Sequence, residues 1–470
     1  MRHVFLAILA GVPAVAFGLG SLPPQIVRAL DVAHLPLSAA SFLVVDVDTG
    51  HVALSENPDT LRSPGSTIKL LTTYAILDTL GPAYTWHTRA LASVAPEKGV
   101  LRGDLILQGG GDPYMTLDRW WRFAGELRRQ GLDAIRGNII IDDRAFALPQ
   151  VDPGAFDSHP HRPYNAVPDA LSVNFQAVDI RVQPDVRARR IEIIADPAPV
   201  NLRIDNLVRF VAGRCTERTD RIDFEVPSQT WDHVVLKGAM AAHCAPQEFT
   251  RVLLQPAQYA FGTFTALWRE LGGEFTGGLR IGAAPPDAKL LLSFASLPLG
   301  EIIKLTNKFS NNLMARDLFL TLGANRFGEP ATPDKGIAAM REWGQRQGLD
   351  LREVVLDNGA GLSRTARVSA TALAAVLRAA FHSRYAPEFL ASLPLAGVDG
   401  TLRTRMRDVP PGAVRLKTGH IDGVSAVAGY VLVPGGRTYI LVSLLNDSRV
   451  NSGAGEPVHA ALVQWILATL

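Results

Sequence analysis

Hydrophobic residues follow two different periods along this chain, and the order of the periods predicts its architecture. Apolar positions flank an Asp-Thr-Gly turn in residues 41–54, which predicts a β-hairpin. A Ser-Pro-Gly break and a continuous apolar run follow, so a helix is expected to begin near Ser66. Later periods of 3.6 predict helices over residues 301–322, 336–347, 369–383 and 457–470, and β-rich runs predict strands over residues 424–433 and 439–445.

The middle of the chain is β-rich. Residues 90–151 alternate short strands with turns around one predicted helix, 117–130, and residues 172–250 alternate β-branched runs with polar turns. We therefore expect an α/β (α+β) fold, in which strands from both ends of the chain join one sheet flanked by helices. The middle would form separate inserted domains. The last helix, 457–470, lacks a basic flank, which favours core packing over contact with a membrane.

The N-terminus has the pattern of an export signal. A basic start precedes an apolar stretch over residues 4–20 that ends near the small residues Ala16 and Gly18. This order predicts a signal peptide over residues 1–20 and an exported chain, in the periplasm or the cell-wall space. An uncleaved membrane anchor is the alternative, although Pro13 and the glycines weaken the span.

Composition and charge exclude some classes of protein. The 470 residues are 47% hydrophobic and 20% charged, as in a folded protein of several domains. With 47 basic and 45 acidic residues, the net charge is +2 and no long run of one sign occurs. The chain therefore does not have the basic field of a nucleic-acid-binding protein.

The two cysteines predict a structural disulfide. Cys215 and Cys244 lie 29 positions apart, and an exported chain meets an oxidising compartment. Their spacing does not match the paired ligands of a zinc site. Residues Asp157, His159 and His161 look like a metal cluster, but their proline-broken spacing favours a solvated loop, so no metal or cofactor is expected. The glycine run at 109–112 predicts a tight turn, because it lacks the Gly-Lys-Ser/Thr ending of a phosphate loop.

Ser66 and Lys69 form the first candidate for chemistry. Their spacing of three places both side chains on one face of the predicted helix. A helix cap followed by a surface lysine would show the same pattern. A serine nucleophile needs a base, and the chain has no Gly-x-Ser-x-Gly elbow to suggest a histidine triad. Lysine can be that base if burial and a second lysine lower its pKa.

Two more triplets fit the same chemistry. Ser310-Asn311-Asn312 lies near the start of a helical segment, where a hydroxyl can relay a proton and an amide can hold Lys69. Lys417-Thr-Gly follows apolar residues on a predicted strand, where lysine and hydroxyl can hold a carboxylate.

The order of these motifs resembles the penicillin-binding proteins and serine β-lactamases, which carry Ser-x-x-Lys, Ser-x-Asn and Lys-Thr-Gly on the same kinds of element. Residues 357–364 and 395–402 are similar to segments of the class C low-molecular-mass penicillin-binding proteins, the D-alanyl-D-alanine carboxypeptidase/endopeptidases. The long gap between Ser66 and Ser310 also fits, because that subfamily inserts two domains between its first two motifs.

The resemblance implies a domain plan. A β-lactamase/transpeptidase-like catalytic domain would comprise residues 25–85 and 285–470. One smaller, mainly β domain would comprise residues 86–170 and 251–284, with a second β-rich domain, 171–250, nested inside it.

The resemblance also implies roles at the first two motifs. Ser66 would be the acylated nucleophile and Lys69 its general base. Ser310 and Asn312 would complete the catalytic set.

The third motif would bind substrate. Lys417 and Thr418 would engage the terminal carboxylate, and Gly419 would let the acyl chain lie against the strand. The backbone N–H groups of Ser66 and His420 would form the oxyanion hole. His420 departs from the family, which commonly has Ser or Thr there, so a hydroxyl for the carboxylate is missing.

One further position is implied by the segment 137–146, which looks like the inserted-domain segment whose aspartate faces the diamino-acid side chain of the peptide. Asp142 is the matching residue. An acidic strand end in a turn is the structural alternative.

The function expected from the resemblance is a serine DD-peptidase that acts on peptidoglycan peptides and is acylated by β-lactams. A β-lactamase or esterase with the same chemistry is an alternative, although the chain is longer than such enzymes need and shows no Glu-x-x-x-Asn pair after the second motif. A catalytically silent wall-binding protein is the third reading. Peripheral membrane or cell-wall association and a homodimer are left open.

Overall fold

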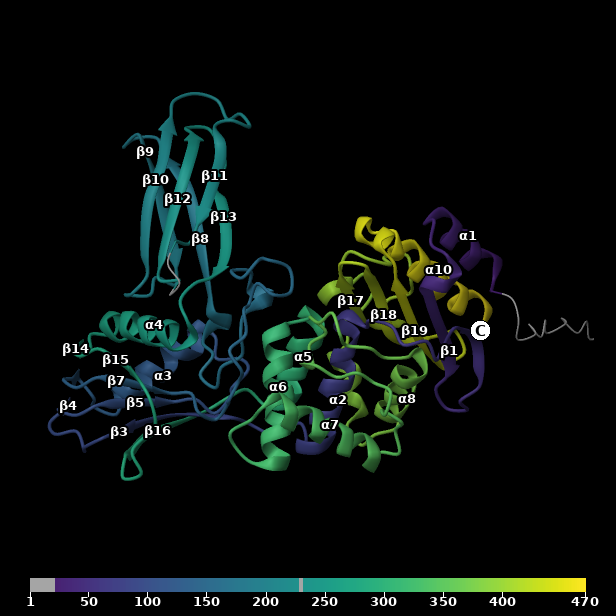
Figure 1. Ribbon diagram of the computed structural model, residues 1–470, viewed down its shortest axis with the longest axis horizontal. Helices are drawn as coiled ribbons and strands as arrows, with labels where there is room; N and C mark the ends of the chain where they lie inside the picture. Colours follow the sequence, from purple (N-terminus) through teal and green to yellow (C-terminus); the bar gives the residue numbers. More distant parts are fainter. Residues whose placement is uncertain (1–21, 228–230) are drawn as a thin grey trace, which may run out of the picture.

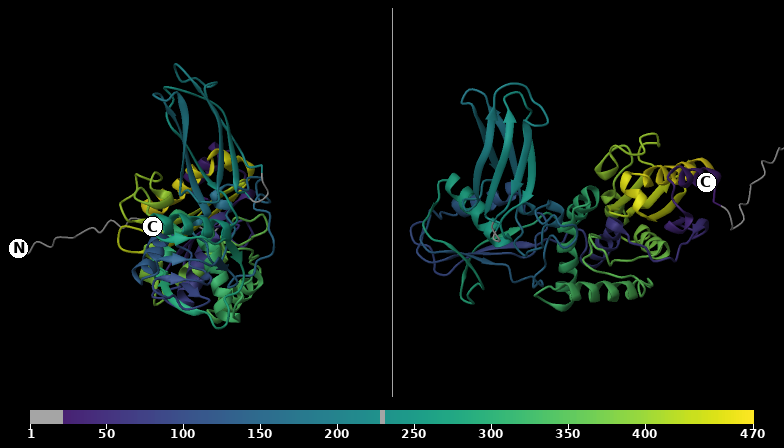
Figure 2. Two further views of the ribbon diagram at one scale, coloured as in Figure 1. Left: turned by 90° about the vertical axis from the view of Figure 1, so that its left-hand side faces the viewer. Right: turned by 45° about the horizontal axis from the view of Figure 1, so that its top comes forward.

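The computed structural model describes residues 22–227 and 231–470 (Figure 1). The predicted signal peptide, residues 1–20, lies outside this part of the chain. Within the described ranges, no helix is long and apolar enough to cross a membrane. The described chain forms a helix-flanked sheet, a second sheet with two helices beside it, and a pair of small sheets that project from the second (Figure 2).

The first sheet joins the two ends of the chain. Its order is β17-β18-β19-β1-β2, every neighbouring pair is antiparallel, and Val44 lies opposite Leu441. The predicted N-terminal hairpin is β1-β2, and the prediction that strands from both ends share one sheet is confirmed. The strands are β1 (Ala40–Asp46), β2 (Val52–Glu56), β17 (Val414–Ile421), β18 (Val424–Leu432) and β19 (Thr438–Asn446).

Helices cover both faces of this sheet because its inner strands bury both alternating sets of side chains. In β1, Phe42 and Val44 join a core shared with α1 and α10, whereas Leu43 and Val45 join a core shared with α2 and α5–α9. The predicted core packing of the last helix is confirmed, since the apolar face of α10 is buried there. The helices are α1 (Pro24–Val32), α2 (Lys69–Leu80), α5 (Leu299–Phe309), α6 (Asn312–Phe327), α7 (Pro333–Arg346), α8 (Ala370–Phe381), α9 (Ala386–Ser392) and α10 (Gly455–Thr469).

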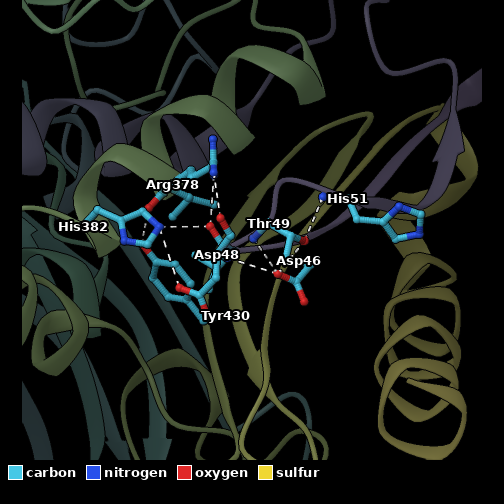
Figure 3. Close-up of polar contacts among 9 residues, drawn as sticks. Asp46, Asp48, Thr49, His51, Arg378, His382 and Tyr430 are labelled. Atoms are coloured by element: carbon cyan, nitrogen blue, oxygen red, sulfur yellow. Dashed lines mark hydrogen bonds and ion pairs between the residues drawn. The ribbon is translucent and has the colours of Figure 1, made fainter.

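The turn between β1 and β2 is fastened to α8 by polar contacts (Figure 3). Thr49 donates to Asp46 Oδ1 from its backbone N and from its hydroxyl, each at 2.9 Å, and these bonds lower the pKa of Asp46. Arg378 Nε donates to the carbonyl oxygen of Val47 at 3.0 Å, and His382 Nε2 lies 3.0 Å from the same oxygen. The hairpin is therefore held in place at its turn as well as along its strands.

The second sheet has the order β15-β7-β5-β3-β16, with α3 and α4 packed together beside it. β16 lies past the predicted boundary at residue 285 and pairs with β3, so this sheet continues to Ala295. The hydrophobic pattern alone did not reveal this, because an edge strand of either domain would look the same. The elements are β3 (His87–Ala92), β5 (Leu105–Gln108), β7 (Ile139–Asp142), β15 (Leu279–Ile281), β16 (Lys289–Ala295), α3 (Leu117–Arg129) and α4 (Pro256–Glu270), with a small sheet of β4 (Val100–Leu101), β6 (Ala134–Ile135) and β14 (Glu274–Phe275).

The projecting part consists of two three-stranded sheets, β10-β12-β11 and β13-β8-β9. Cys215 and Cys244 form the predicted disulfide, between the ends of strands of this part. In the described chain, the one close group of potential metal ligands is this pair with Asp220, and sulfurs joined to each other are not thiolate ligands. The strands are β8 (Ala177–Asp185), β9 (Arg190–Asp196), β10 (Arg203–Val211), β11 (Asp220–Glu225), β12 (His233–Ala241) and β13 (Gln247–Val252).

Candidate active site

Ser66 lies where one type of helix changes into another. Gly65–Ile68 form a 3-10 turn, and α2 begins at Lys69. Pro64 has no N–H to donate, and Gly65 has a left-handed φ of +49° that glycine adopts without strain. The half-buried Ser66 therefore lies in the 3-10 turn just before the α-helix, and the fully buried Lys69 is the first residue of that helix.

The Nζ atom of Lys69 has three hydrogen-bond partners from three segments. It lies 2.9 Å from Ser66 Oγ, 2.7 Å from Asn312 Oδ1 and 2.5 Å from the carbonyl oxygen of Ala360. The two carbonyl-type oxygens can only accept, so two N–H groups are committed to them. The remaining position faces the Ser66 hydroxyl, where a neutral amine would present its lone pair.

The surroundings of Lys69 favour that neutral form. Burial lowers the pKa of Lys69 well below its usual range, and the positive charges of Lys417 and Arg316 lower it further. Burial and a second lysine were predicted from the sequence, whereas the contribution of Arg316 was not. A buried amine that is neutral near neutral pH can accept a proton from Ser66.

The second motif lies at a break between two helices. The sequence predicted one helical stretch over residues 301–322, but α5 ends at Phe309 and α6 begins at Asn312. Ser310 takes a left-handed φ of +56°, and Asn311 caps α6 by accepting from the Met314 N–H at 3.0 Å. The break turns the side chains of Ser310 and Asn312 toward Lys417 and Lys69.

The orientation of the Asn312 amide is fixed from the inserted domain. Its Nδ2 donates to the carbonyl oxygen of Tyr164 at 3.1 Å, which leaves Oδ1 to accept from Lys69. One turn later on α6, Arg316 donates to the carbonyl oxygen of Ala166 at 3.0 Å. Nothing in the sequence indicated that residues 148–168, which we call the connector, would meet α6.

Lys417 lies on β17, as predicted. Its buried Nζ donates to Ser310 Oγ at 2.9 Å and to the carbonyl oxygen of Thr418 at 2.7 Å, which leaves a third N–H for a ligand. Burial lowers the pKa of Lys417 to about 7, and the positive charge of Arg405 contributes. The lysine and Ser310 together form a polar end to the site.

Thr401 also belongs to this end of the site, and the sequence argument did not single it out. Its hydroxyl lies 2.8 Å from the hydroxyl of Thr418. Thr401 falls within the segment 395–402 that carried part of the resemblance, which was the only signal that could have found it. A hydroxyl is therefore present beside Thr418, although His420, which is exposed, does not supply one.

Glycines allow the Ser66 segment and β17 to meet. A Cβ atom at position 419 would lie 2.6 Å from the Pro64 carbonyl oxygen and 3.0 Å from the Ser66 backbone N. A Cβ atom at Gly65 would lie 3.3 Å from the backbone N of His420. The backbone N–H groups of Ser66 and His420 are thus close across the junction of the 3-10 turn and β17, as an oxyanion hole requires.

Asp142 is not brought into this cluster by any hydrogen bond of the described chain. It is buried at the end of β7. Although burial acts to raise its pKa, hydrogen bonds from Arg144, Ala284 and Gln108 lower it. The bond from Arg144 Nε is 2.9 Å long. The predicted contact of Asp142 with a substrate side chain stays a prediction, and the carboxylate has a structural role in the turn after β7.

A cavity of about 460 Å³ adjoins the site. The connector forms one wall, and the segment 357–365 with part of α6 forms the other. Arg364 stacks over the ring of Phe156, 4.2 Å from its centroid, and lies 3.6 Å from Asp422 at the end of β17. The inserted domain thus shapes the region beside the catalytic residues.

Asp317 of α6 lies near two carboxyl groups of the inserted domain, the buried Asp112 and the half-buried Asp169. Both oxygens of Asp317 and Oδ2 of Asp112 have no hydrogen-bond partner in the described chain. Burial raises the pKa of Asp112 to about 6, against the opposing charge of Arg119. Burial also raises the pKa of Asp169 to about 7, together with Asp143. Ionisation of these groups costs free energy, because each would bury a negative charge away from water.

We expect Asp112→Asn to stabilise the protein at pH 8 and not at pH 3. The folded pKa is above the ordinary 3.8, so the folded state retains a proton that the unfolded state has lost between about pH 4 and pH 6. The free energy of unfolding therefore falls as pH rises through that window, and the asparagine avoids this loss. A gain of up to about 3 kcal/mol at pH 8 follows from the shift.

Denaturant unfolding at the two pH values measures this gain. Asp287→Asn, at an exposed position before β16, is the matched control and should change neither value. An equal gain at both pH values for Asp112→Asn would contradict the account, because it would not depend on ionisation.

The fold and the site together define the class of serine enzymes that transfer acyl groups. An antiparallel sheet covered by helices brings together two buried lysines, each hydrogen-bonded to a serine, and two inserted domains are attached beside it.

Comparisons with known proteins agree with this class. Residues 25–469 match the model of the D-Ala-D-Ala carboxypeptidase 3 (S13) family. A D-alanyl-D-alanine carboxypeptidase of Actinomadura sp. is 30% identical over 486 residues, which cover 99% of this chain and 88% of that protein. Penicillin binding protein 4 of Haemophilus influenzae has a similar structure at 24% identity, with a TM-score of 0.76 and coverage of 90% and 93% of the two chains. A structure of the same protein with a novel β-lactam has a TM-score of 0.75 at 22% identity, with coverage of 94% and 99%.

The chain belongs to the D-Ala-D-Ala carboxypeptidase 3 (S13) family. The family and the enzyme class predicted from the three motifs, a serine-type D-Ala-D-Ala carboxypeptidase, are confirmed.

Proposed function

We propose that this chain cleaves D-alanyl-D-alanine and the related cross-link bonds of peptidoglycan through an acyl-enzyme on Ser66. The observation that carries the proposal is the position of Lys69 Nζ, which is held by Asn312 and Ala360 with its third position on Ser66 Oγ. A general base must lie within hydrogen-bond reach of the proton that it removes, and this amine does.

Acylation begins when Ser66 Oγ attacks the carbonyl carbon of the scissile bond and its proton passes to Lys69. The charge that develops on the carbonyl oxygen is stabilised by the N–H groups of Ser66 and His420. The tetrahedral intermediate then expels its amine, which takes up the proton that Lys69 removed from Ser66, so Lys69 is neutral again. Ser310 accepts a hydrogen bond from Lys417, and its hydroxyl would relay that proton from Lys69 to the amine.

Deacylation repeats these steps with water in place of Ser66. Lys69 takes a proton from the attacking water, and the ester bond to Ser66 Oγ breaks. The serine recovers its proton, and the free acid leaves. The same base and oxyanion donors therefore serve both halves of the reaction.

The terminal carboxylate of the substrate would bind Lys417 and the paired hydroxyls of Thr418 and Thr401. Charge-assisted bonds of this kind are the strong ones. Thr401 offers the hydroxyl that the family commonly has at position 420.

The charge of Lys417 gives a testable pH dependence. Its pKa is lowered to about 7, so the free enzyme loses this charge as pH rises through neutrality. We expect kcat/KM for a peptide ending in D-alanyl-D-alanine to fall above about pH 7 relative to that for the same peptide with an amidated C-terminus. The amidated peptide controls for all other ionisations, since it has no carboxylate for Lys417. A constant ratio from pH 6 to pH 9 would contradict the role of Lys417.

The same serine would be acylated by β-lactams, which present a strained amide and a carboxylate to these groups. The Haemophilus relative was solved with a β-lactam. A β-lactamase would differ in releasing the acyl group quickly, and a silent wall-binding protein would form no acyl-enzyme.

Export and cell-wall location are part of the proposal, supported by the N-terminal pattern and by the family. Peripheral association with the membrane or wall and a homodimer stay predictions.

The experiment measures three reactions of the purified protein. A fluorescent penicillin should label one peptide, which mass analysis would identify as the one containing Ser66. D-Alanine should be released from a pentapeptide, and the penicillin should be turned over far more slowly. Absence of a label would support a catalytically silent wall-binding protein. Rapid β-lactam turnover without D-alanine release would support a β-lactamase.

A further inference from the structure

Two large apolar side chains are exposed at the polar end of the site. Phe309 is 68% exposed and immediately precedes Ser310, and Val398 is 50% exposed and lies three residues before Thr401. Single exposed apolar residues are common on protein surfaces, but a phenylalanine exposed to this extent beside a catalytic motif needs a reason.

The local structure brings together the two chain segments that carry these residues. In α5, Asn307 and Lys308 are buried, and Lys308 Nζ forms an ion pair with Asp399 at 2.5 Å. A Cβ atom at Gly400 would lie 2.6 Å from the Lys308 carbonyl oxygen, so the loop that carries Val398 lies directly against the end of α5. Phe309 follows Lys308 on the outer side of this junction.

This junction adjoins the residues proposed to bind the carboxylate of the leaving group. Ser310 accepts from Lys417, and Thr401 pairs with Thr418, so each apolar residue lies within three positions of a residue of the proposed carboxylate site. In a DD-peptidase substrate, that carboxylate belongs to the amine that leaves. Whatever else the leaving amine carries must extend past this end.

Peptides that end in D-alanyl-D-alanine and cross-linked peptides have leaving groups that differ in the length of their apolar part. D-Alanine has a methyl group only. In a cross-linked peptide, the leaving amine belongs to a diamino acid, whose methylene chain continues to a second stem peptide.

We propose that Phe309 and Val398 form a leaving-group rim, which packs on this methylene chain and favours cross-linked peptides over free D-alanyl-D-alanine ends. The inference rests on the proposed function and adds the substrate preference of the same site. The bond cleaved and the catalytic residues are the same for both substrates, and only the long leaving group reaches the rim. Apolar area removed from water at the rim then lowers the barrier for the cross-linked substrate alone.

The test compares kcat/KM of Phe309→Ala and the parent on two substrates, a pentapeptide and a cross-linked muropeptide dimer. We expect the value for the dimer to fall about threefold to tenfold, as for loss of a partly exposed apolar contact, with the pentapeptide value unchanged. Phe309→Leu should restore most of the loss. Phe327→Ala, at the far end of α6 and 40% exposed, is the matched control and should change neither value.

An equal fall on both substrates, or no fall on the dimer, would overturn the rim. The labelling of Ser66 by penicillin in the parent separates this outcome from failure of the proposed function. Suppose that the parent is labelled and releases D-alanine, while Phe309→Ala leaves the ratio of kcat/KM for the dimer to that for the pentapeptide unchanged. In that case the proposed function holds and the rim alone is wrong.

Discussion

Lys69→Met is expected to lower the rate of Ser66 acylation by penicillin, and of D-alanine release, by about 10³-fold to 10⁴-fold. Methionine fills much of the same buried space but has no group that accepts a proton. Two hydrogen bonds are lost at the same time, which leaves Asn312 Oδ1 and the Ala360 carbonyl without their lysine. The expected loss therefore combines the missing base with a less ordered site.

Stopped-flow or quenched labelling with a fluorescent penicillin measures this rate directly. Ser66→Ala sets the background because it removes the nucleophile, and Lys304→Ala, on the exposed side of α5, controls for loss of a lysine. Circular dichroism and the thermal midpoint show whether the variant is folded. A folded Lys69→Met protein that is acylated within tenfold of the parent rate would show that another group is the base.

The rate should also depend on pH in a defined direction. Lys69 acts as a base only when neutral, and burial with the neighbouring charges of Lys417 and Arg316 lowers its pKa. Acylation should therefore weaken as the pH falls and Lys69 gains a proton, and this loss should occur at a lower pH than for a lysine with the ordinary pKa. An ordinary surface lysine would instead give a rate that still rises steeply above pH 9.

Gly419→Ala is expected to lower the acylation rate by about 10²-fold to 10³-fold, the usual effect of losing one oxyanion donor. The new Cβ would lie 2.6 Å from the Pro64 carbonyl oxygen and 3.0 Å from the Ser66 backbone N. Both are backbone atoms and cannot rotate away, so β17 and the 3-10 turn must separate. The N–H groups of Ser66 and His420 would then no longer converge on one oxygen.

Gly282→Ala is the matched control for this substitution. No atom lies within 4 Å of a Cβ built at Gly282, so the same change there should alter neither rate nor stability. An unchanged acylation rate in Gly419→Ala would mean that the two segments do not need to stay so close. A fall in rate with an unchanged thermal midpoint would locate the effect in the oxyanion hole rather than in the fold.

Much of the fold could be read from hydrophobic periodicity. The hairpin β1-β2, the helices that follow, and the strands β18 and β19 have the strong local patterns that buried elements need on both faces of a sheet. The boundary of the inserted domain could not be predicted from the hydrophobic pattern in the same way. β16 lies beyond residue 285, and only its pairing with β3 assigns it to the second sheet. Strand pairing joins segments that are distant in sequence, so local pattern does not determine it.

The break before Asn312 shows a similar limit. Residues 301–322 have continuous helical propensity, yet Ser310 adopts a left-handed conformation and Asn311 begins a new helix. Tertiary contacts of Ser310 with Lys417 and of Asn312 with Lys69 override the propensity.

The sequence by itself determined which residues are the candidates for catalysis. Ser66 and Lys69 are close because three residues make about one helical turn, and the apolar residues around the motifs ensure that they are buried. Both relations involve residues that are close together in the chain, so they can be recognised from the spacing of the motif and the composition around it.

Tertiary structure decided how those residues work together. The meeting of Lys69 with Asn312 and Ala360, the pairing of Thr418 with Thr401, and the contact of Gly400 with Lys308 all join segments far apart in the chain. Hydrogen-bond geometry and the free energy of a buried charge depend on distances through space and on exclusion of water, and neither is fixed until the whole domain has packed.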